Sequence, residues 1–128
     1  MIAHISIGVR DVERSKRFYD AVLEPLGYKC IRAARKLTGY GYGCDSIAFW
    51  VVSADHPVPA DKKSGLHFCF RGPNAEAVDA FHAAALRSGG HDNGAPGLRP
   101  EYGPDYYAAF IIAPDGYRIE AYFGPGET

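Results

Sequence analysis

The sequence has no long apolar run, no excess of charge of either sign and few cysteines. Its 128 residues carry 14 basic and 15 acidic side chains, for a formal net charge of −1. A nucleic-acid-binding domain usually shows a basic patch or stripe, and none occurs here. The longest apolar stretches have the length of a strand, far short of the roughly 20 residues that a membrane-spanning helix needs. We therefore expect neither a nucleic-acid nor a membrane partner.

The three cysteines, Cys30, Cys44 and Cys69, lie far apart in the sequence. None belongs to a C-x-x-C pair, so their spacing indicates neither a disulfide framework nor a thiolate zinc site. Residues 1–9 also lack the charged start and long apolar centre of a signal peptide. These features predict a cytoplasmic protein whose cysteines are reduced and mostly buried as small apolar residues.

The two halves of the chain resemble one another. A shift of 63 residues aligns residues 4–27 with residues 67–90 and brings identical residues together at five places. The matching pairs are His4 and His67, Phe18 and Phe81, Ala21 and Ala84, Leu23 and Leu86, and Gly27 and Gly90. Such a repeat predicts that one structural unit occurs twice.

The first half begins with a strand at residues 4–9, where β-branched side chains alternate with others. Asp11 is a suitable N-cap for a helix that extends to about Leu23, and Pro25 and Gly27 end it. Three short strands are predicted next, at residues 28–35, 40–44 and 46–52. Residues 53–64 contain two prolines and several charges and are predicted to form a linker.

The second half follows the same plan. A strand at residues 66–70 precedes a helix that Asn74 caps and that ends at Gly89 and Gly90. A loop rich in glycine and proline, with room for one short strand, is predicted from Asp92 to Asp105, and it is a candidate lid. The last two strands, at residues 106–113 and 117–123, are joined by a tight turn.

The predicted fold is therefore α+β and occupies one domain, residues 1–128. Two βαβββ modules, at about residues 1–52 and 65–128, form a curved mixed-sheet cup with the helices on the outside.

Two histidines and one glutamate are predicted to share the inner face of this cup. Alternate residues of a strand face opposite sides, and His4, His67 and Glu120 each alternate with apolar residues that should pack on the helices. Two imidazoles and one carboxylate leave open coordination positions on a divalent ion such as iron, zinc, nickel or manganese. A substrate with two neighbouring oxygens could bind there while the metal acts as a Lewis acid. Taken singly, each histidine is an ordinary core or surface residue and Glu120 an exposed charge.

Three segments of the chain resemble the vicinal oxygen chelate superfamily, which includes glyoxalase I, bleomycin-resistance proteins, methylmalonyl-CoA epimerase and extradiol dioxygenases. They are IAHISIGVRDVERSKRFYDAVLEPLGY, GLHFCFRGPNAEAVDAFHAAALRSGG and YYAAFIIAPDGYRIEAYF. The resemblance implies metal ligands on the first, fifth and last strands, which here are His4, His67 and Glu120. It also implies a homodimer, in which the site lies within one chain or is shared between two.

The fourth predicted strand departs from the family's best-known member. Glyoxalase I takes a further glutamate ligand from that strand, whereas SIAFWVV has no carboxylate or amide. Classical glyoxalase I activity is therefore disfavoured. Extradiol dioxygenases resemble the three-ligand set more closely, but they are usually longer and carry further histidines near the metal.

Several residues are candidates for catalysis or substrate binding around the metal. Glu120 and Tyr107 are the catalytic candidates, through proton exchange with the substrate. Arg99 is a candidate for binding a carboxylate or phosphate. The remaining substrate-binding candidates are Tyr102, Tyr106, Trp50, Phe49 and Cys69. Each also has a plain structural interpretation, as a solvated cation or a packing residue.

The leading hypothesis is a metal-dependent isomerase, lyase or dioxygenase that acts on a small oxygen-chelating molecule. A metal-free protein of the resistance type, which sequesters a ligand in an aromatic cleft, is the alternative. A structural dimer module with vestigial ligands is a third interpretation.

Overall fold

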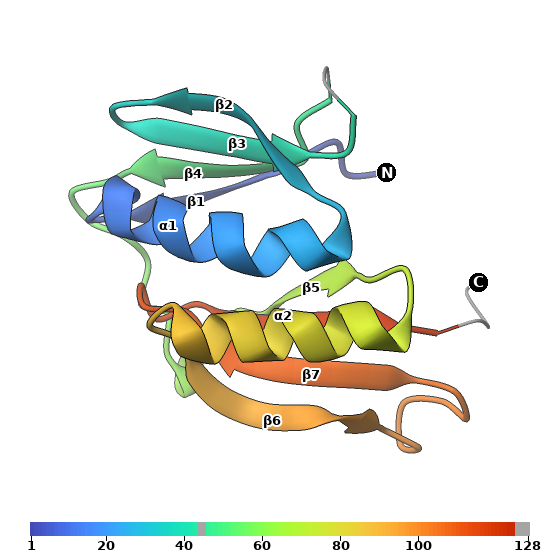
Figure 1. Ribbon diagram of the computed structural model, residues 1–128. Helices are drawn as coiled ribbons and strands as arrows, with labels where there is room; N and C mark the ends of the chain where they lie inside the picture. The colour runs from blue at the N-terminus through green and yellow to red at the C-terminus, as the bar shows by residue number, and fades with distance from the viewer. Residues whose placement is uncertain (44–45, 125–128) are drawn as a thin grey trace.

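The computed structural model describes residues 1–43 and 46–124 and shows two βαβββ modules (Figure 1). The first module consists of β1 (Ile5–Val9), α1 (Val12–Leu23), the 3-10 helix η1 (Glu24–Leu26), β2 (Lys29–Ala34), β3 (Leu37–Gly41) and β4 (Phe49–Ser53). A short helix, η2 (Lys62–Ser64), precedes the second module. That module consists of β5 (Phe68–Arg71), α2 (Ala75–Arg87), β6 (His91–Leu98), β7 (Tyr107–Ile112) and β8 (Arg118–Phe123). The predicted fold class is confirmed.

The two four-stranded sheets have the same topology, as the sequence repeat predicts. Their strand orders are β1-β4-β3-β2 and β5-β8-β7-β6. In each sheet the first strand pairs in parallel with the last strand of its module, and the remaining neighbours are antiparallel. Strands β1 and β5 are therefore edge strands, each with one hydrogen-bonding side unpaired within its sheet.

Both long helices begin at the predicted caps. The Asp11 carboxylate accepts a hydrogen bond from the Arg14 backbone N–H at 3.0 Å, and the Asn74 side chain accepts one from Ala77 at 2.8 Å. These acceptors satisfy backbone donors that the first helical turn leaves without partners. After η1, Gly27 adopts a positive φ of 93°, a conformation that side chains with a Cβ rarely take.

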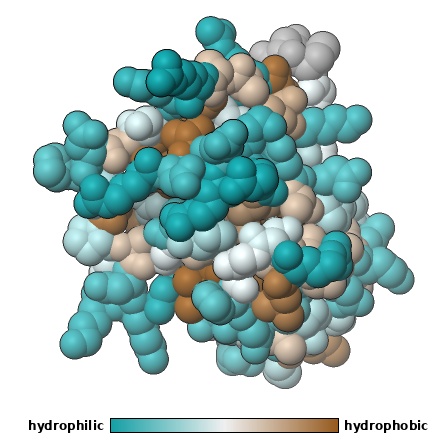
Figure 2. Space-filling model, turned by 60° about the vertical axis from the view of Figure 1, so that its left-hand side comes forward, coloured by the Kyte–Doolittle hydropathy of each residue, from teal (hydrophilic) through white to brown (hydrophobic). Residues whose placement is uncertain are grey.

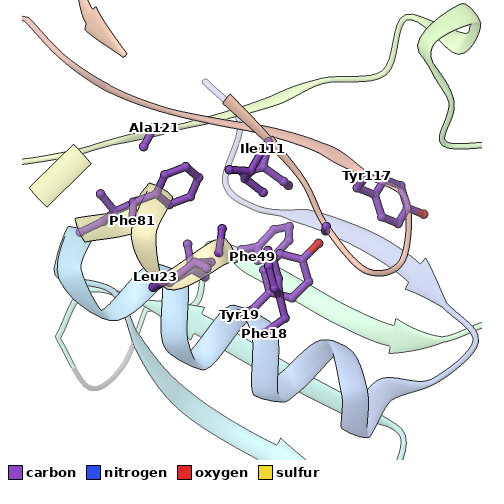
Figure 3. Close-up of a cluster of buried hydrophobic side chains, with 14 of the residues drawn as sticks. Phe18, Tyr19, Leu23, Phe49, Phe81, Ile111, Tyr117 and Ala121 are labelled. Carbon is purple, nitrogen blue, oxygen red and sulfur yellow. The ribbon is translucent and has the colours of Figure 1, made fainter. Parts of the chain in front are cut away.

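Helices α1 and α2 lie side by side, and each packs against one face of its own sheet (Figure 1). Their buried faces join in one core cluster that draws on both modules. Figure 3 shows Phe18 and Tyr19 of α1 close to Phe49 of β4, with Phe81 of α2 opposite. Tyr19 meets the Phe18 and Phe49 rings edge to face, with centroids 5.2 Å away in each case. The modules are thus held together by shared apolar burial.

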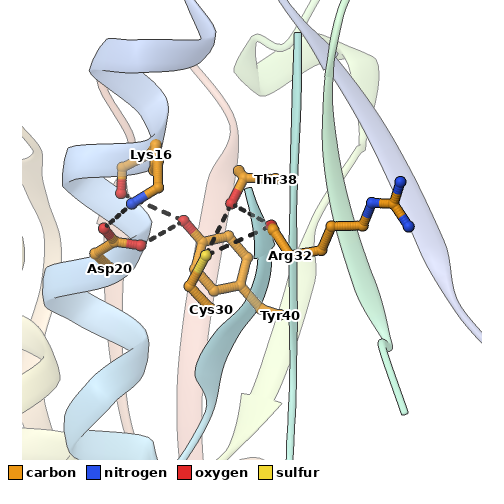
Figure 4. Close-up of polar contacts among 6 residues, drawn as sticks. All are labelled: Lys16, Asp20, Cys30, Arg32, Thr38 and Tyr40. Atoms are coloured by element: carbon orange, nitrogen blue, oxygen red, sulfur yellow. Dashed lines mark hydrogen bonds and ion pairs between the residues drawn. The ribbon is translucent and has the colours of Figure 1, made fainter. Parts of the chain in front are cut away.

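Polar contacts attach α1 to strand β3 and join β3 to β2 (Figure 4). The Tyr40 hydroxyl donates to the Asp20 carboxylate at 2.8 Å, and the Lys16 ammonium lies 2.7 Å from the same side chain. On β2, the Sγ of Cys30 lies 3.2 Å from the Thr38 hydroxyl. Both described cysteines, Cys30 and Cys69, are exposed, so the prediction that they are buried was wrong for these two.

The sequence was least informative about two strands. The predicted loop from Asp92 to Asp105 allowed one short strand, and the structure has an eight-residue strand, β6, which begins at His91 and runs antiparallel to β7. Its register shifts on both sides of Gly94, which shows how glycine and proline fit into an edge strand with bulges. Strand β3 starts and ends earlier than predicted. Cys44, the predicted end of that strand, lies outside the described residues.

Hydrophilic side chains dominate the face of the molecule shown in Figure 2, and apolar ones form small separate patches. Among the described residues, no helix is both long and apolar enough to cross a membrane.

Candidate functional site

His67 and Glu120 meet on the face of the second sheet that α2 does not cover, which we call the site face. The imidazole Nε2 of His67 lies 2.8 Å from Oε1 of Glu120. Glu120 is 5% exposed, whereas the His67 side chain is 43% exposed. A buried carboxylate is thus presented to a half-open imidazole, and both groups have the chemistry of metal ligands or proton carriers.

The strand register explains this meeting. Parallel pairing of β5 with β8 places Cys69 beside Glu120, and His67 precedes Cys69 by two residues. Antiparallel pairing of β8 with β7 places Phe110 on the other side of Glu120. Side chains of paired residues share a face, so these residues form one row across the sheet. Ile119 and Ala121, the neighbours of Glu120 on β8, point into the core as predicted.

Tyr106 holds the second oxygen of Glu120. Its hydroxyl donates to Oε2 at 2.5 Å, and its ring stacks on Tyr122 with centroids 4.4 Å apart and planes inclined by 21°. Burial, together with the hydrogen bond to Glu120, raises the pKa of Tyr106 well above its usual value. The phenol therefore stays protonated and remains a hydrogen-bond donor to the carboxylate.

Cys69 shares this network, as its predicted face requires. Burial of the thiol against its neighbours, followed by the nearby Glu120 charge, raises the pKa of Cys69 to about 12. The residue is exposed when measured as a whole, but its sulfur is close enough to Glu120 and Tyr106 to interact with both. A thiol with this pKa is neutral at physiological pH and therefore a weak nucleophile and metal ligand.

Adjacent residues of a strand point to opposite sides, and this separates the residues of two predicted pairs, Tyr106 from Tyr107 and Phe49 from Trp50. The Tyr107 hydroxyl donates to Asp79 of α2 at 2.5 Å, so Tyr106, and not Tyr107, contacts Glu120. Phe49 is buried in the core against Tyr19, whereas Trp50 points to the other side of β4, with its indole over Gly39. Phe49 and Trp50 therefore cannot contact one substrate from the same face of β4.

The remaining predicted substrate-binding residues lie around the edge of the site face. The Arg99 guanidinium lies over the Phe110 ring, 5.4 Å from its centroid, and donates to the Ala95 carbonyl at 2.6 Å. Tyr102 is exposed, and its ring centroid lies 5.3 Å from that of Tyr106. Both are therefore placed where a ligand of Glu120 could reach them.

His4 is the predicted ligand that the chain does not bring to His67 and Glu120. It is exposed and precedes β1, in the other sheet. Across residues 1–43 and 46–124, no group of three or more histidine, cysteine, aspartate or glutamate side chains is arranged to hold a metal. Two of the three predicted donors converge within one chain, and the third does not.

Sequence reasoning missed the aromatic surroundings of the pair. Phe110 lies against His67, with ring centroids 5.9 Å apart, and Tyr122 supports Tyr106. The sequence alone places Tyr122 on the same face as Glu120, because the two residues are two apart along β8. Phe110 could not be assigned to this row without the register of β7.

An apolar cavity of about 200 Å³ adjoins the site along β5. His67 and Cys69 line it from the site side, and Ile5 and Ala48 line it from the first module. Aromatic rings form most of the remaining wall: Tyr28, Tyr40, Phe49, Phe68 and Phe70.

A family model for the Glyoxalase/Bleomycin resistance protein/Dioxygenase superfamily matches residues 1–121. A glyoxalase/bleomycin resistance protein from Albidiferax ferrireducens T118 is 32% identical, with a TM-score of 0.81; the match covers 95% of this chain and 98% of that one. The chain belongs to the glyoxalase/bleomycin resistance protein/dioxygenase superfamily. No curated protein matches it.

More distant members of this superfamily share the fold. The fosfomycin resistance protein FosX from Mesorhizobium loti is 17% identical, with a TM-score of 0.69, over 98% of this chain and 93% of that one. A lactoylglutathione lyase from Agrobacterium tumefaciens is 19% identical, with a TM-score of 0.64, over 97% and 93%. At these identities the likeness concerns architecture alone, and function must be argued from the site.

Proposed function

We propose that this superfamily member is a divalent-metal-dependent enzyme that acts on a small molecule with two neighbouring oxygens. The observation that carries the proposal is the 2.8 Å approach of His67 Nε2 to Glu120 Oε1, with Glu120 almost fully buried. Burying a carboxylate costs several kcal/mol unless it is paired, and here Tyr106 and His67 supply that pairing. A divalent ion held by His67 and Glu120 would pair the carboxylate as well, and an imidazole and a carboxylate this close together are suitable ligands for one.

The residues present fit a metal ion in part. His67 and Glu120 would hold it, because an imidazole and a carboxylate directed at one point are a common part of zinc and iron sites. A second copy of the chain would supply the third ligand, His4. The pairing of two such half-sites by a twofold axis is the simplest way for a chain of this kind to complete its cup.

The exposed start of the first module supports this dimer. Ile2 is 75% exposed and Ile5 37% exposed, next to His4 and the unpaired edge of β1. Strand β5, which follows His67, has an unpaired edge as well. Unpaired edges that carry apolar residues are usually protected in a native assembly. Placing β1 of one copy against β5 of the other would cover both edges and bring His4 to Glu120.

A bound divalent ion would act as a Lewis acid toward the substrate oxygens. Among the described residues, Glu120 is our candidate for carrying a proton to or from the substrate, because its Oε1 contacts the half-exposed His67 imidazole. Tyr106 holds Oε2 and thereby fixes the direction of Oε1. Arg99 and Tyr102 are placed to contact the far end of a bound substrate.

Classical glyoxalase I chemistry remains disfavoured. Strand β4 consists of Phe49, Trp50, Val51, Val52 and Ser53, and it offers no carboxylate to the site. An isomerase, lyase or dioxygenase reaction with one protein carboxylate fits the residues better. The free cysteines Cys30 and Cys69 suit a reducing compartment, and we propose a cytoplasmic location.

Metal analysis of the purified protein tests the proposal. After anaerobic reconstitution with Fe²⁺, Mn²⁺, Ni²⁺ or Zn²⁺, we expect about one bound ion per chain in the wild type. His67→Ala and Glu120→Gln should abolish stoichiometric binding, whereas His56→Ala, which removes an exposed loop histidine, should leave it unchanged. Substoichiometric metal that is unaffected by His67→Ala would contradict the proposal.

A metal-free binding protein of the resistance type is the second candidate. The 200 Å³ cavity with its five aromatic wall residues favours it, because such cavities accept small apolar ligands. Quenching of the single tryptophan, Trp50, can be followed in a ligand screen. Micromolar binding that is indifferent to chelator would favour sequestration over metal-dependent catalysis.

A further inference from the structure

Three arginines lie on the same face of the second sheet as Glu120. Arg71 lies on β5, two residues beyond Cys69, with its guanidinium 5.5 Å from the Tyr122 ring centroid. Arg118 lies on β8, two residues before Glu120, and so shares its face. Arg99 reaches the same face over Phe110.

This concentration of positive charge is local. The whole chain has a formal net charge of −1, whereas the strand positions of Arg71 and Arg118 and the contact of Arg99 with Phe110 place three arginines on the site face, which has one buried carboxylate, Glu120. Within the described part of the chain, neither Arg99 nor Arg118 forms an ion pair. Clustered charge of one sign raises the local concentration of ligands of the opposite sign. An anion is therefore attracted to this face.

Arg99 is the arginine best placed to bind such an anion. Its Nη2 donates to the Ala95 carbonyl, and its plane rests on Phe110, so the guanidinium is held in position. The centroid of the Phe110 ring lies 5.4 Å from the Arg99 guanidinium carbon and 5.9 Å from the centroid of the His67 ring. The Arg99 guanidinium and the His67 ring are therefore at most about 11 Å apart. A single small molecule can span that distance.

We propose that the substrate is an anion: a small molecule that bears a carboxylate or phosphate group in addition to its two neighbouring oxygens. Arg99 binds the anionic group, and Arg118 contributes to the attracting field. A guanidinium suits this task because its fork of N–H donors matches carboxylate and phosphate oxygens in pairs. This inference rests on the proposed function, because it concerns the part of the same substrate that lies away from the metal.

A matched pair of probes tests this specificity. Catechol and 3,4-dihydroxybenzoate share the same two neighbouring oxygens, and only the second carries a carboxylate. Their affinities would be measured by calorimetry in the presence of Mn²⁺, for the wild type, Arg99→Gln, Arg99→Lys and Arg87→Gln. Arg87 is exposed at the end of α2, away from the site face, and serves as the control.

The wild type and Arg87→Gln should bind 3,4-dihydroxybenzoate at least about tenfold more tightly than catechol, as expected for one charge-assisted contact. Arg99→Gln should remove that preference without changing the affinity for catechol, and Arg99→Lys should restore part of it. Added salt should weaken binding of the anion only. Equal affinity for the two probes, or no saturable binding of 3,4-dihydroxybenzoate, would overturn the inference. Metal content, measured separately, decides the proposed metal dependence.

Discussion

The His67 imidazole and the Glu120 carboxylate lie 2.8 Å apart although 53 residues separate them in the sequence. Parallel pairing of β5 with β8 produces this contact. Within the described chain, His4, the third predicted ligand, does not join this pair to form a group of three that could hold a metal. The contact brings two of the three proposed metal ligands together in the second module. The third, His4, directly precedes β1, the corresponding strand of the other sheet.

Tyr106 is expected to orient Glu120 toward a metal. Because its hydroxyl holds Oε2, Tyr106→Phe should weaken Mn²⁺ binding by roughly 10-fold or more, as loss of a hydrogen bond to a metal ligand commonly does. Tyr107→Phe makes the same chemical change on the adjacent residue, which bonds Asp79 instead, and should leave Mn²⁺ affinity unchanged. Calorimetric titration of both variants measures the difference. Equal effects of the two substitutions would remove Tyr106 from this role.

Cys69 is expected to react slowly with alkylating reagents at neutral pH. Its pKa is raised to about 12, and the thiolate is the reactive form. In a Cys30→Ser, Cys44→Ser background treated with chelator, the rate of iodoacetamide labelling should therefore rise steadily above about pH 9. Glu120→Gln removes the neighbouring charge and should move that rise to lower pH. Rapid labelling near pH 8 in the protein that retains Glu120 would show that the pKa of Cys69 is not raised.

Much of this architecture could be predicted from the sequence. The 63-residue shift identified the two modules, and alternation placed His67, Cys69 and Glu120 on one face. Alternation alone could not decide between adjacent tyrosines: Tyr107 was the catalytic candidate, whereas Tyr106 is the tyrosine that contacts Glu120. Nor could composition distinguish a loop from β6, because its glycines occupy register shifts in an edge strand.

Asp115 links the modules and is expected to make stability depend on pH. Its carboxylate accepts hydrogen bonds from Ser15 at 3.0 Å and Tyr19 at 3.2 Å, and burial raises its pKa above the usual 3.8. A group whose pKa is higher in the folded than in the unfolded state stabilises the protein most at pH values below its unfolded-state pKa. That stabilisation is lost as pH rises through its folded-state pKa. The free energy of unfolding of the wild type, relative to Asp115→Asn, should therefore fall between about pH 4 and about pH 7.

Urea denaturation of both proteins at the two pH values measures this change. Lys63→Gln, a substitution of an exposed residue outside the core, serves as the control and should show no such trend. A difference between wild type and Asp115→Asn that grows with pH would show that the carboxylate is stabilised in its charged form.

The central claim is that His4 of one copy completes the site formed by His67 and Glu120 of another. Metal content of mixed dimers tests it directly. His4→Ala and His67→Ala should each bind almost no metal alone. After unfolding and refolding together in equal amounts, half of the dimers contain one copy of each variant, and each such dimer regains one intact site. The account predicts about a quarter of the wild-type metal content in the mixture; metal that stays at the level of the separate variants would contradict it.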